Sequence, residues 1–283
     1  MSLTFRPLSH ALGAEIQGVD LGKPLSNSEF DQIHSKFLES GILLFRNQKI
    51  TREQHIAFSR RFGELDRHDS LPRDRHPDYP ELLLVTNIPE KDGKESASKY
   101  TGQQWHSDMS FTLEPSLGSL LRGITIPPVG GDTMFTNMYM AYDTLSDGMK
   151  KMIEPLHGVH TGRRKVTDRD TEREREQTRI NPPIAQPLVR VHPETGRKAL
   201  YIGEKVSSLV GMTEEESKPI IDYLVRHATR PQFVYRHQWR QDDILLWDNR
   251  CTMHIALGDY AEGEIRHLER TTVKGTPSGY YLQ

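Results

Sequence analysis

Apolar residues along this chain of 283 residues recur at helical spacing in a few segments and at the spacing of strands in most others. Three sequences of the form Ser/Thr-x-x-Glu/Gln precede helical segments and predict capped helix starts at Ser26, Thr51 and Thr213. We expect the helix after Thr51 to extend through Phe62 and to end at Gly63. The helical segments are few, and they are separated by long stretches of extended pattern.

Extended segments account for most of the remaining pattern. Residues 42–45 form a continuous apolar run and predict a buried strand. Residues 188–191 and 198–202 flank a Pro-Glu-Thr-Gly sequence, which predicts a hairpin. Residues 232–239 place aromatic and histidine side chains at alternate positions, and a last strand is expected at about residues 266–273. The pattern favours a mainly β fold with flanking helices.

Composition narrows the class of protein. The chain has 37 basic and 39 acidic residues and a mean hydropathy of -0.65, so its bulk charge indicates neither a nucleic-acid nor a membrane partner. The single cysteine, Cys251, excludes an internal disulfide framework. The first residues lack the pattern of a secretory leader, so a cytoplasmic protein is expected. Without an internal repeat or a clear boundary, residues 1–283 are expected to form one domain.

One segment is unusually charged. Residues 163–179 include seven basic and five acidic side chains. The ordinary interpretation is a solvated helix or loop, which we favour. The alternative is a flap over a pocket, and position in the sequence does not decide between them.

The candidate chemistry begins at His106-Ser107-Asp108. Two imidazoles and one carboxylate can hold a ferrous ion on one face and leave the opposite face open. If residues 106–108 form a strand, His106 and Asp108 share a face and Ser107 points away. His254 on a facing strand would complete the set. With 13 histidines in the chain, a His-x-Asp sequence alone is a weak signal.

Two further features strengthen the candidate. A Gly130-Gly131 turn precedes Thr133 and would place its hydroxyl at the start of a strand. Arg266 and Arg270 are four apart and would share one face of the last strand. They face either solvent or a pocket; inside a pocket, each would need an anion because an unpaired buried charge is very unfavourable.

These features together resemble the taurine / 2,4-dichlorophenoxyacetate dioxygenase family, which consists of Fe(II)- and 2-oxoglutarate-dependent oxygenases. The motifs that carry the resemblance are residues 105–108 (WHSD), 130–133 (GGDT), 247–250 (WDNR) with His254, the pair Arg266 and Arg270, and residues 58–65 (FSRRFGEL). The similarity extends over nearly the whole chain, and the order and spacing of the motifs are specific only jointly. The strand-rich pattern then implies a double-stranded β-helix, or jelly roll, with helices outside.

The resemblance implies a role for each residue. His106, Asp108 and His254 would bind Fe(II). Thr133 and Arg266 would bind the C5 carboxylate of 2-oxoglutarate, and Arg270 the anionic group of the substrate. No catalytic side chain is implied beyond the metal centre. The reaction would convert 2-oxoglutarate and O2 to succinate and CO2 while the substrate is hydroxylated. Members of the family often form dimers or tetramers, so the resemblance implies a homo-oligomer of either size.

The substrate pocket departs from the taurine pattern. His68 falls near the expected histidine and is a candidate substrate ligand, although a histidine within Asp-Arg-His-Asp is more often solvated. Leu71, Gly102 and Val206 stand where a tyrosine, an asparagine and an aromatic residue would line a taurine site. We therefore expect an aryloxyalkanoate-type carboxylate in preference to an alkyl sulfonate or a sulfate ester.

Two other classes stay open at this point. A cupin-type metal-dependent hydrolase or isomerase would need no 2-oxoglutarate, so Thr133 and Arg266 would have no purpose. A jelly-roll binding module without activity would tolerate the loss of a metal ligand, whereas all three candidate ligands are present. Both classes explain fewer residues than an oxygenase does.

Overall fold

The computed structural model describes residues 3–69, 71, 74–89, 93, 96, 98–99, 101–161 and 182–282. The charged segment 163–179 lies outside these residues, so the choice between a flap and a solvated segment stays a prediction. No described helix is long and apolar enough to span a bilayer.

A seven-stranded sheet forms the larger layer of the molecule, in the order β1-β2-β3-β13-β5-β15-β4. Its members pair antiparallel except for β2 and β3, which are parallel. The strands are β1 (Thr4–Pro7), β2 (Ala14–Gln17), β3 (Ile42–Phe45), β4 (Leu83–Thr86), β5 (Gly118–Thr125), β13 (Ile244–Asp248) and β15 (His267–Val273). The strands predicted at residues 42–45 and 266–273 are thus confirmed.

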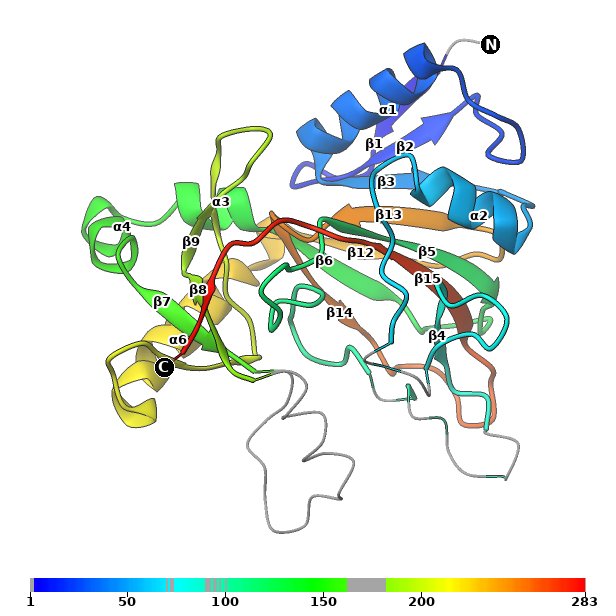
Figure 1. Cartoon of the computed structure of the whole chain (residues 1–283). Helices are drawn as coiled ribbons and strands as arrows, with labels where there is room; N and C mark the ends of the chain where they lie inside the picture. The colour runs from blue at the N-terminus through cyan, green and yellow to red at the C-terminus, as the bar shows by residue number, and fades with distance from the viewer. Residues whose placement is uncertain are drawn as a thin grey trace.

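A three-stranded sheet in the order β12-β6-β14 faces the larger one (Figure 1). It consists of β12 (Val234–His237), β6 (Thr133–Asn137) and β14 (Thr252–Ala256). Phe135 of the smaller sheet packs with Trp247 and Leu268 of the larger sheet in one buried apolar cluster. The two sheets therefore enclose a common core, as a jelly roll requires.

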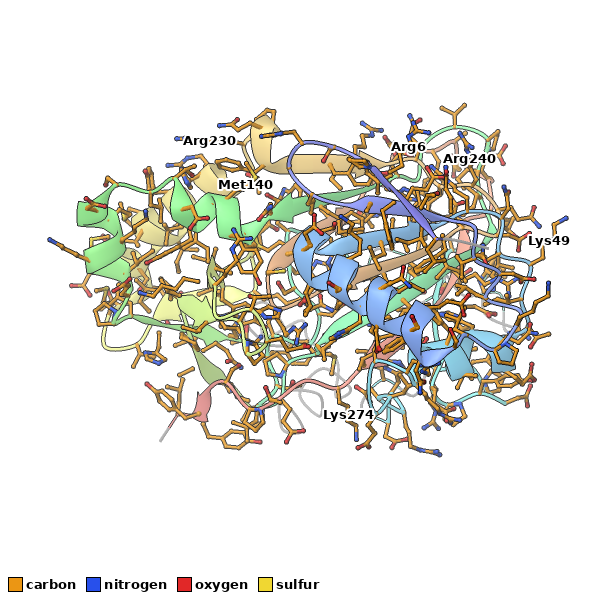
Figure 2. The ribbon with its side chains drawn as sticks, turned by 90° about the horizontal axis from the view of Figure 1, so that it is seen from above. Arg6, Lys49, Met140, Arg230, Arg240 and Lys274 are labelled. Carbon is orange, nitrogen blue, oxygen red and sulfur yellow. The ribbon has the colours of Figure 1, made fainter. Side chains whose placement is uncertain are left out.

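The outer face of the larger sheet is covered by α1 (Asn27–Ser40) and α2 (Arg52–Ser59). Phe37 and Phe58 from these helices pack with Phe45 of β3 in a second buried cluster. The view from above shows α1 lying across the sheet, while the side chains of Arg6 and Lys49 project outward at the margin (Figure 2). Burial of both faces explains why β3 is a continuous apolar run.

The rest of the chain forms a second group of elements (Figure 1). A four-stranded sheet has the order β11-β7-β8-β16, and β9 pairs with β10. The elements are α3 (Met138–Asp143), α4 (Asp147–Ile153), β7 (His157–His160), β8 (Ile184–Pro187), β9 (Val189–Val191), β10 (Lys198–Leu200), β11 (Val206–Leu209), α6 (Glu214–Ala228), the 3-10 helix η1 (Pro231–Phe233) and β16 (Tyr280–Tyr281). The predicted hairpin is β9-β10.

The predicted helix starts are confirmed, and one predicted helix end is wrong. Ser26, Thr51 and Thr213 each form a capping box with the residue three positions later. However, α2 ends at Ser59, before Phe62. The amide of Phe62 donates to the carbonyl oxygen of Ser59, and that of Gly63 to Arg60, so the chain continues as tighter turns.

Candidate metal centre

His106 and His254 face each other across a backbone bridge. The amide of His106 donates to the carbonyl oxygen of His254 at 3.0 Å, and the reverse bond is 2.8 Å. His254 lies on β14, as the prediction of a facing strand required. Residues 106–108 do not form a strand, because only His106 makes a bridge and Asp108 lies in a turn. Its amide donates to Oδ1 of Asn249 at 2.9 Å instead of to a neighbouring strand.

The carboxylate of Asp108 is buried and fully engaged. Ser119 Oγ donates to its Oδ2 at 2.7 Å, and Arg270 Nη1 donates to its Oδ1 at 2.6 Å. Burial alone would raise the pKa of Asp108, but the guanidinium of Arg270 and the two nearby histidines hold it well below its usual range. The carboxylate is therefore ionised at neutral pH, as a metal ligand must be.

Both histidines are neutral at neutral pH. Burial, assisted by neighbouring positive charge, lowers the pKa of His106 well below its ordinary value and that of His254 to about 4. Nδ1 of His106 lies 2.6 Å from the carbonyl oxygen of Gln104. A carbonyl only accepts, so Nδ1 carries the proton and Nε2 presents its lone pair. Such a second contact fixes the tautomer that binds a metal.

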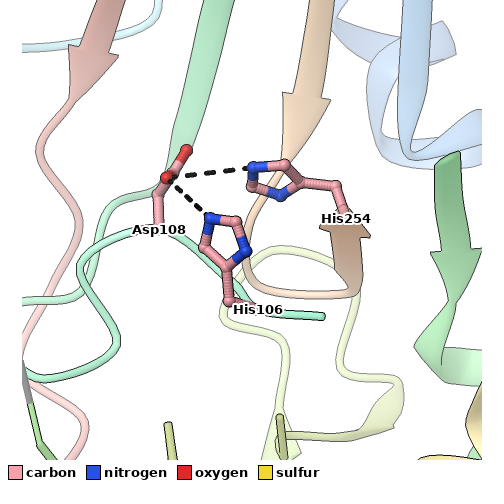
Figure 3. Close-up of side chains that lie close together, drawn as sticks. All are labelled: His106, Asp108 and His254. Atoms are coloured by element: carbon pink, nitrogen blue, oxygen red, sulfur yellow. Dashed lines mark ion pairs between the residues drawn. The ribbon is translucent and has the colours of Figure 1, made fainter. Parts of the chain in front are cut away.

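The Nε2 atoms of both rings face one carboxylate oxygen (Figure 3). Oδ1 of Asp108 lies 3.8 Å from Nε2 of His106 and 3.9 Å from Nε2 of His254. One ligand atom from each residue lies within 4.8 Å of the others. Two neutral imidazoles and one carboxylate match the donor set of non-haem Fe(II) oxygenases, so these residues fit that ion.

A second cluster of metal-ligand types, His192, Asp248 and Cys251, is already satisfied internally. Arg250 donates to both carboxylate oxygens of Asp248, at 2.8 and 2.7 Å, and His192 Nε2 lies 3.0 Å from Oδ2. Burial raises the pKa of the Cys251 thiol well above its ordinary value, which opposes the thiolate that a metal needs. Asp248 is therefore the partner of Arg250 in a buried ion pair, and the cluster is not a candidate metal site.

Arg266 and Arg270 both point into the protein, which settles the choice between solvent and pocket. They are 6% and 9% exposed. Arg266 Nε donates to the carbonyl oxygen of Gly131 at 2.8 Å, and burial lowers its pKa to about 10. Among the described residues, no carboxylate pairs with the Arg266 guanidinium. Such a buried cation favours an anionic ligand.

Thr133 lies at the same end of the site. It is paired with Ala256 across β6 and β14, and Ala256 and Arg266 line one small recess. Trp239 Nε1 donates to Thr133 Oγ1 at 3.0 Å. The hydroxyl proton of Thr133 is therefore free to donate to a ligand oxygen. A carboxylate in the recess would meet the guanidinium of Arg266, whereas Thr133 lies behind the lining residue Ala256.

His68 is buried, contrary to the solvated interpretation of its charged surroundings. The residue is 0% exposed, and neither ring nitrogen has a hydrogen-bond partner within the described part of the chain. Burial and the charge of Arg270 lower the pKa of His68 to about 4, so the ring is neutral at neutral pH. Gly102 lies beside His106, where an added Cβ would be 3.5 Å from Cε1, so its lack of a side chain widens the site.

Two supporting residues were missed by sequence reasoning. Asn249 receives hydrogen bonds from the Asp108 amide and from Trp247 Nε1, and its Nδ2 donates to Ser119 Oγ at 3.1 Å. Asn249 stood inside the quoted Trp-Asp-Asn-Arg motif, so a signal was present. Ser119 had none, because a serine in an apolar strand has no local feature that relates it to Asp108.

Comparisons with known proteins agree with this geometry. Residues 4–272 match the family described as "Taurine catabolism dioxygenase TauD, TfdA family". The chain is 34% identical over 264 residues to the alpha-ketoglutarate-dependent 2,4-dichlorophenoxyacetate dioxygenase of Cupriavidus pinatubonensis, covering 90% of this chain and 92% of that protein. It is 32% identical to an alkylsulfatase of Acinetobacter baylyi, covering 96% and 85%.

Solved structures share the whole fold. The structure of AAD-2 in complex with Mn(II) and N-oxalylglycine superimposes with a TM-score of 0.85, 33% identity and full coverage of both chains. A taurine dioxygenase from Burkholderia xenovorans gives a TM-score of 0.83 at 35% identity, covering 100% of this chain and 95% of that one. The chain therefore belongs to the TauD/TfdA family of 2-oxoglutarate-dependent dioxygenases.

Proposed function

We propose that this dioxygenase hydroxylates a small organic anion at an Fe(II) ion bound by His106, Asp108 and His254, while 2-oxoglutarate is decarboxylated to succinate and CO2. The observation that carries the proposal is the convergence of two neutral imidazoles and one ionised carboxylate within 4.8 Å. The ion, when bound, supplies the activation of O2, and the protein supplies orientation and exclusion of water. The alternatives of a metal-dependent hydrolase, an isomerase or a binding module without activity are less well supported, because the matching family consists of dioxygenases.

The distal carboxylate of 2-oxoglutarate is assigned to Arg266 and Thr133. Arg266 is a buried cation without a carboxylate partner among the described residues, and the Thr133 hydroxyl retains its proton. A guanidinium and a hydroxyl together satisfy one carboxylate by charge-assisted hydrogen bonds. The keto acid end would then extend toward the metal.

The anionic group of the substrate is assigned to Arg270, with His68 beside it. Nε of Arg270 is buried and has no hydrogen-bond partner in the described ranges, although Nη1 pairs with Asp108. An aryloxyalkanoate is the preferred substrate, since relatives named for 2,4-dichlorophenoxyacetate and (S)-phenoxypropionate match over most of the chain. Alkyl sulfates and sulfonates are the alternatives, since relatives named for them also match.

Binding of iron and cosubstrate can be tested without turnover. Fe(II) and 2-oxoglutarate added to the apo-protein without oxygen are expected to produce a visible charge-transfer absorption band. Zn(II) is the matched control, because its filled d shell has no redox chemistry and should give no band. A folded protein that binds both additives yet shows no band would contradict the proposed centre.

The substrate class is decided by succinate formation. We expect aryloxyacetates and aryloxypropionates to give the highest kcat/KM in a screen that also includes alkyl sulfonates and alkyl sulfate esters. All substrates are compared at the same concentrations of O2 and 2-oxoglutarate. The succinate that forms without added substrate is measured separately and subtracted. A higher kcat/KM for sulfonates would show that the preference assigned here is wrong.

The division between the two arginines predicts opposite changes in KM. Arg266→Lys should raise the KM for 2-oxoglutarate roughly ten-fold or more with little effect on the substrate, and Arg270→Lys should do the reverse. In both variants lysine keeps the positive charge but removes the planar guanidinium that can bind a carboxylate through two hydrogen bonds. In Arg270→Lys, the charge beside Asp108 is therefore retained. Arg6→Lys at the exposed margin is the control. Equal effects of both changes on both ligands would refute the division.

Two expectations go beyond these measurements. A cytoplasmic location and a dimeric or tetrameric state stay predictions, which cell fractionation and sedimentation would check. O2 and a small organic anion are the partners that the proposed reaction requires.

A further inference from the structure

A pocket with a volume of about 350 Å³ opens between the end of β15 and the loop that follows Asp108. This volume lies in the range of sites that bind small molecules. Its walls come from the loop at residues 109–116, from Asp66 and from the last part of the chain, at residues 272–281. The described walls include neither Arg266, Arg270 nor any of the three proposed metal ligands, so the pocket is distinct from the sites described above.

The fold holds the walls of this pocket in place. The amide of Asp66 donates to the carbonyl oxygen of Thr272 at 2.8 Å, which joins that wall to β15. The C-terminal segment crosses from β15 to β8, where β16 pairs (Figure 1). It lies so close to the loop that a Cβ added to Gly275 would be 1.9 Å from the carbonyl oxygen of Pro115. The pocket is therefore preformed, as small-molecule sites usually are.

The hydroxyl groups of the loop present acceptors to the pocket. Thr112 Oγ1 donates to the carbonyl oxygen of Met109 at 2.8 Å, and Ser116 Oγ donates to that of Asp108 at 3.0 Å. Because a hydroxyl has one proton, both oxygens retain only lone pairs for a further partner. Thr272 is 1% exposed, and its Oγ1 has no hydrogen-bond partner within the described part of the chain. A buried hydroxyl of this kind is unfavourable until a ligand or a water satisfies it.

The charge that the walls offer to a ligand is negative. Asp66 and Glu114 supply two carboxylates, and among the described residues neither forms an ion pair with a lysine or an arginine. Lys274 also lines the pocket, but its Nζ donates to Glu64 Oε1 at 2.5 Å at the margin of the molecule (Figure 2). Since Lys274 is already paired, the two carboxylates determine which charge the pocket favours.

Charge, hydrogen bonding and apolar contacts together select a class of ligand. A primary ammonium group has one positive charge and three N–H donors, which match two carboxylates and an unpaired hydroxyl. Met109, Leu113 and the ring of Tyr281 supply apolar contacts for a carbon skeleton, and the face of an aromatic ring also attracts a cation. An anion would meet two like charges, so the pocket does not suit 2-oxoglutarate or an anionic substrate.

We propose that this pocket binds a primary ammonium ligand with an apolar skeleton, such as an arylalkylamine, through Asp66, Glu114 and the hydroxyl of Thr272. The ligand is a molecule separate from 2-oxoglutarate and from the anionic substrate, because both of these require cations. The inference goes beyond the proposed reaction and does not depend on it.

Calorimetry on the protein loaded with Mn(II) and 2-oxoglutarate tests the pocket with three probes that share a phenylethyl group. 2-Phenylethylammonium has a charge and N–H donors, its N,N,N-trimethyl derivative has the charge alone, and 2-phenylethanol is neutral. We expect the primary ammonium to bind about ten-fold or more tightly than the alcohol, and about three-fold or more tightly than the trimethyl derivative. Asp66→Asn/Glu114→Gln should reduce the first ratio to about two-fold or less without weakening the alcohol. Glu39→Gln, at an exposed position of α1, is the control and should leave both ratios unchanged.

Each result supports or overturns the proposal. Equal binding of the primary ammonium and the alcohol to the wild-type protein overturns it, as does a preference that survives the double change in a variant with normal circular dichroism. Equal binding of the primary and trimethyl ammonium probes contradicts the role given to the N–H donors. Glu114 is exposed, so Glu114→Gln alone should fold normally, and a ratio lowered about two-fold or more in that variant supports the site even if Asp66→Asn disturbs the structure.

Discussion

Asp108→Ala is expected to abolish both stoichiometric Fe(II) binding and substrate-dependent succinate formation. The carboxylate is the only anionic group among the three proposed ligands, and it also neutralises Arg270 at 2.6 Å. Without it, two neutral imidazoles and a nearby guanidinium surround the position of a dication, so Coulomb repulsion replaces attraction. Metal content after anaerobic gel filtration and succinate assays measure the two losses.

Ser119→Ala is the graded companion to this change. Ser119 Oγ donates to Asp108 Oδ2 at 2.7 Å, so its loss should weaken metal affinity roughly 10- to 100-fold while the ligand set stays intact. The rise in the midpoint of thermal unfolding with added Mn(II) reports affinity without turnover. If Asp108→Ala retained a full equivalent of iron and wild-type turnover, the assignment of the metal centre would be wrong.

Arg250→Met is expected to lower the free energy of unfolding by roughly 3–5 kcal/mol, because it leaves a buried carboxylate without its cation. Asp248 is 0% exposed and accepts hydrogen bonds from the Arg250 side chain and amide and from His192. Urea unfolding at pH 7 measures the loss. Arg60→Met removes an exposed pair with Glu81 and should change stability by less than about 1 kcal/mol. A change of that small size in Arg250→Met would contradict the expectation.

The same pair predicts how stability depends on pH. Burial alone would raise the pKa of Asp248, but Arg250 and His192 lower it to about 2 from an ordinary value of 3.8. A depressed pKa contributes stability above pH 3.8, and this contribution, roughly 2 kcal/mol, is lost as the pH falls through about 2. In Arg250→Met, this acid-dependent loss should disappear. The double variant Asp248→Leu/Arg250→Met should recover part of the stability, since no buried charge remains.

Local signals in the sequence predicted local structure well. The capping boxes at Ser26 and Thr213 depend on residues three positions apart, so they could be recognised without tertiary information. The end of α2 was missed because the tighter turns through Phe62 preserve a helix-like spacing of its aromatic side chains. The β3 run was predicted because burial on both faces leaves a purely apolar segment.

Features that depend on distant contacts were predicted incompletely. Nothing near Asp108 indicates that its amide bonds to Asn249, so a strand through residues 106–108 was an open alternative before the fold was known. The inward direction of Arg266 was one of two alternatives until its burial was known. The residue types at a site can be predicted from sequence more readily than the hydrogen bonds and the packing that hold those residues in place.

The backbone bridge between His106 and His254 also orders events during synthesis. His106 and Asp108 leave the ribosome while β14, the strand that carries His254, is still untranslated, and β13, whose Trp247 contacts His254, is also late in the chain. A nascent or prematurely terminated chain would therefore hold two of the three proposed ligands and no complete site. With the proposed ligand set, oxidising chemistry would begin only in a chain in which β14 has been made and paired with β6, so unfinished protein would be spared the reaction.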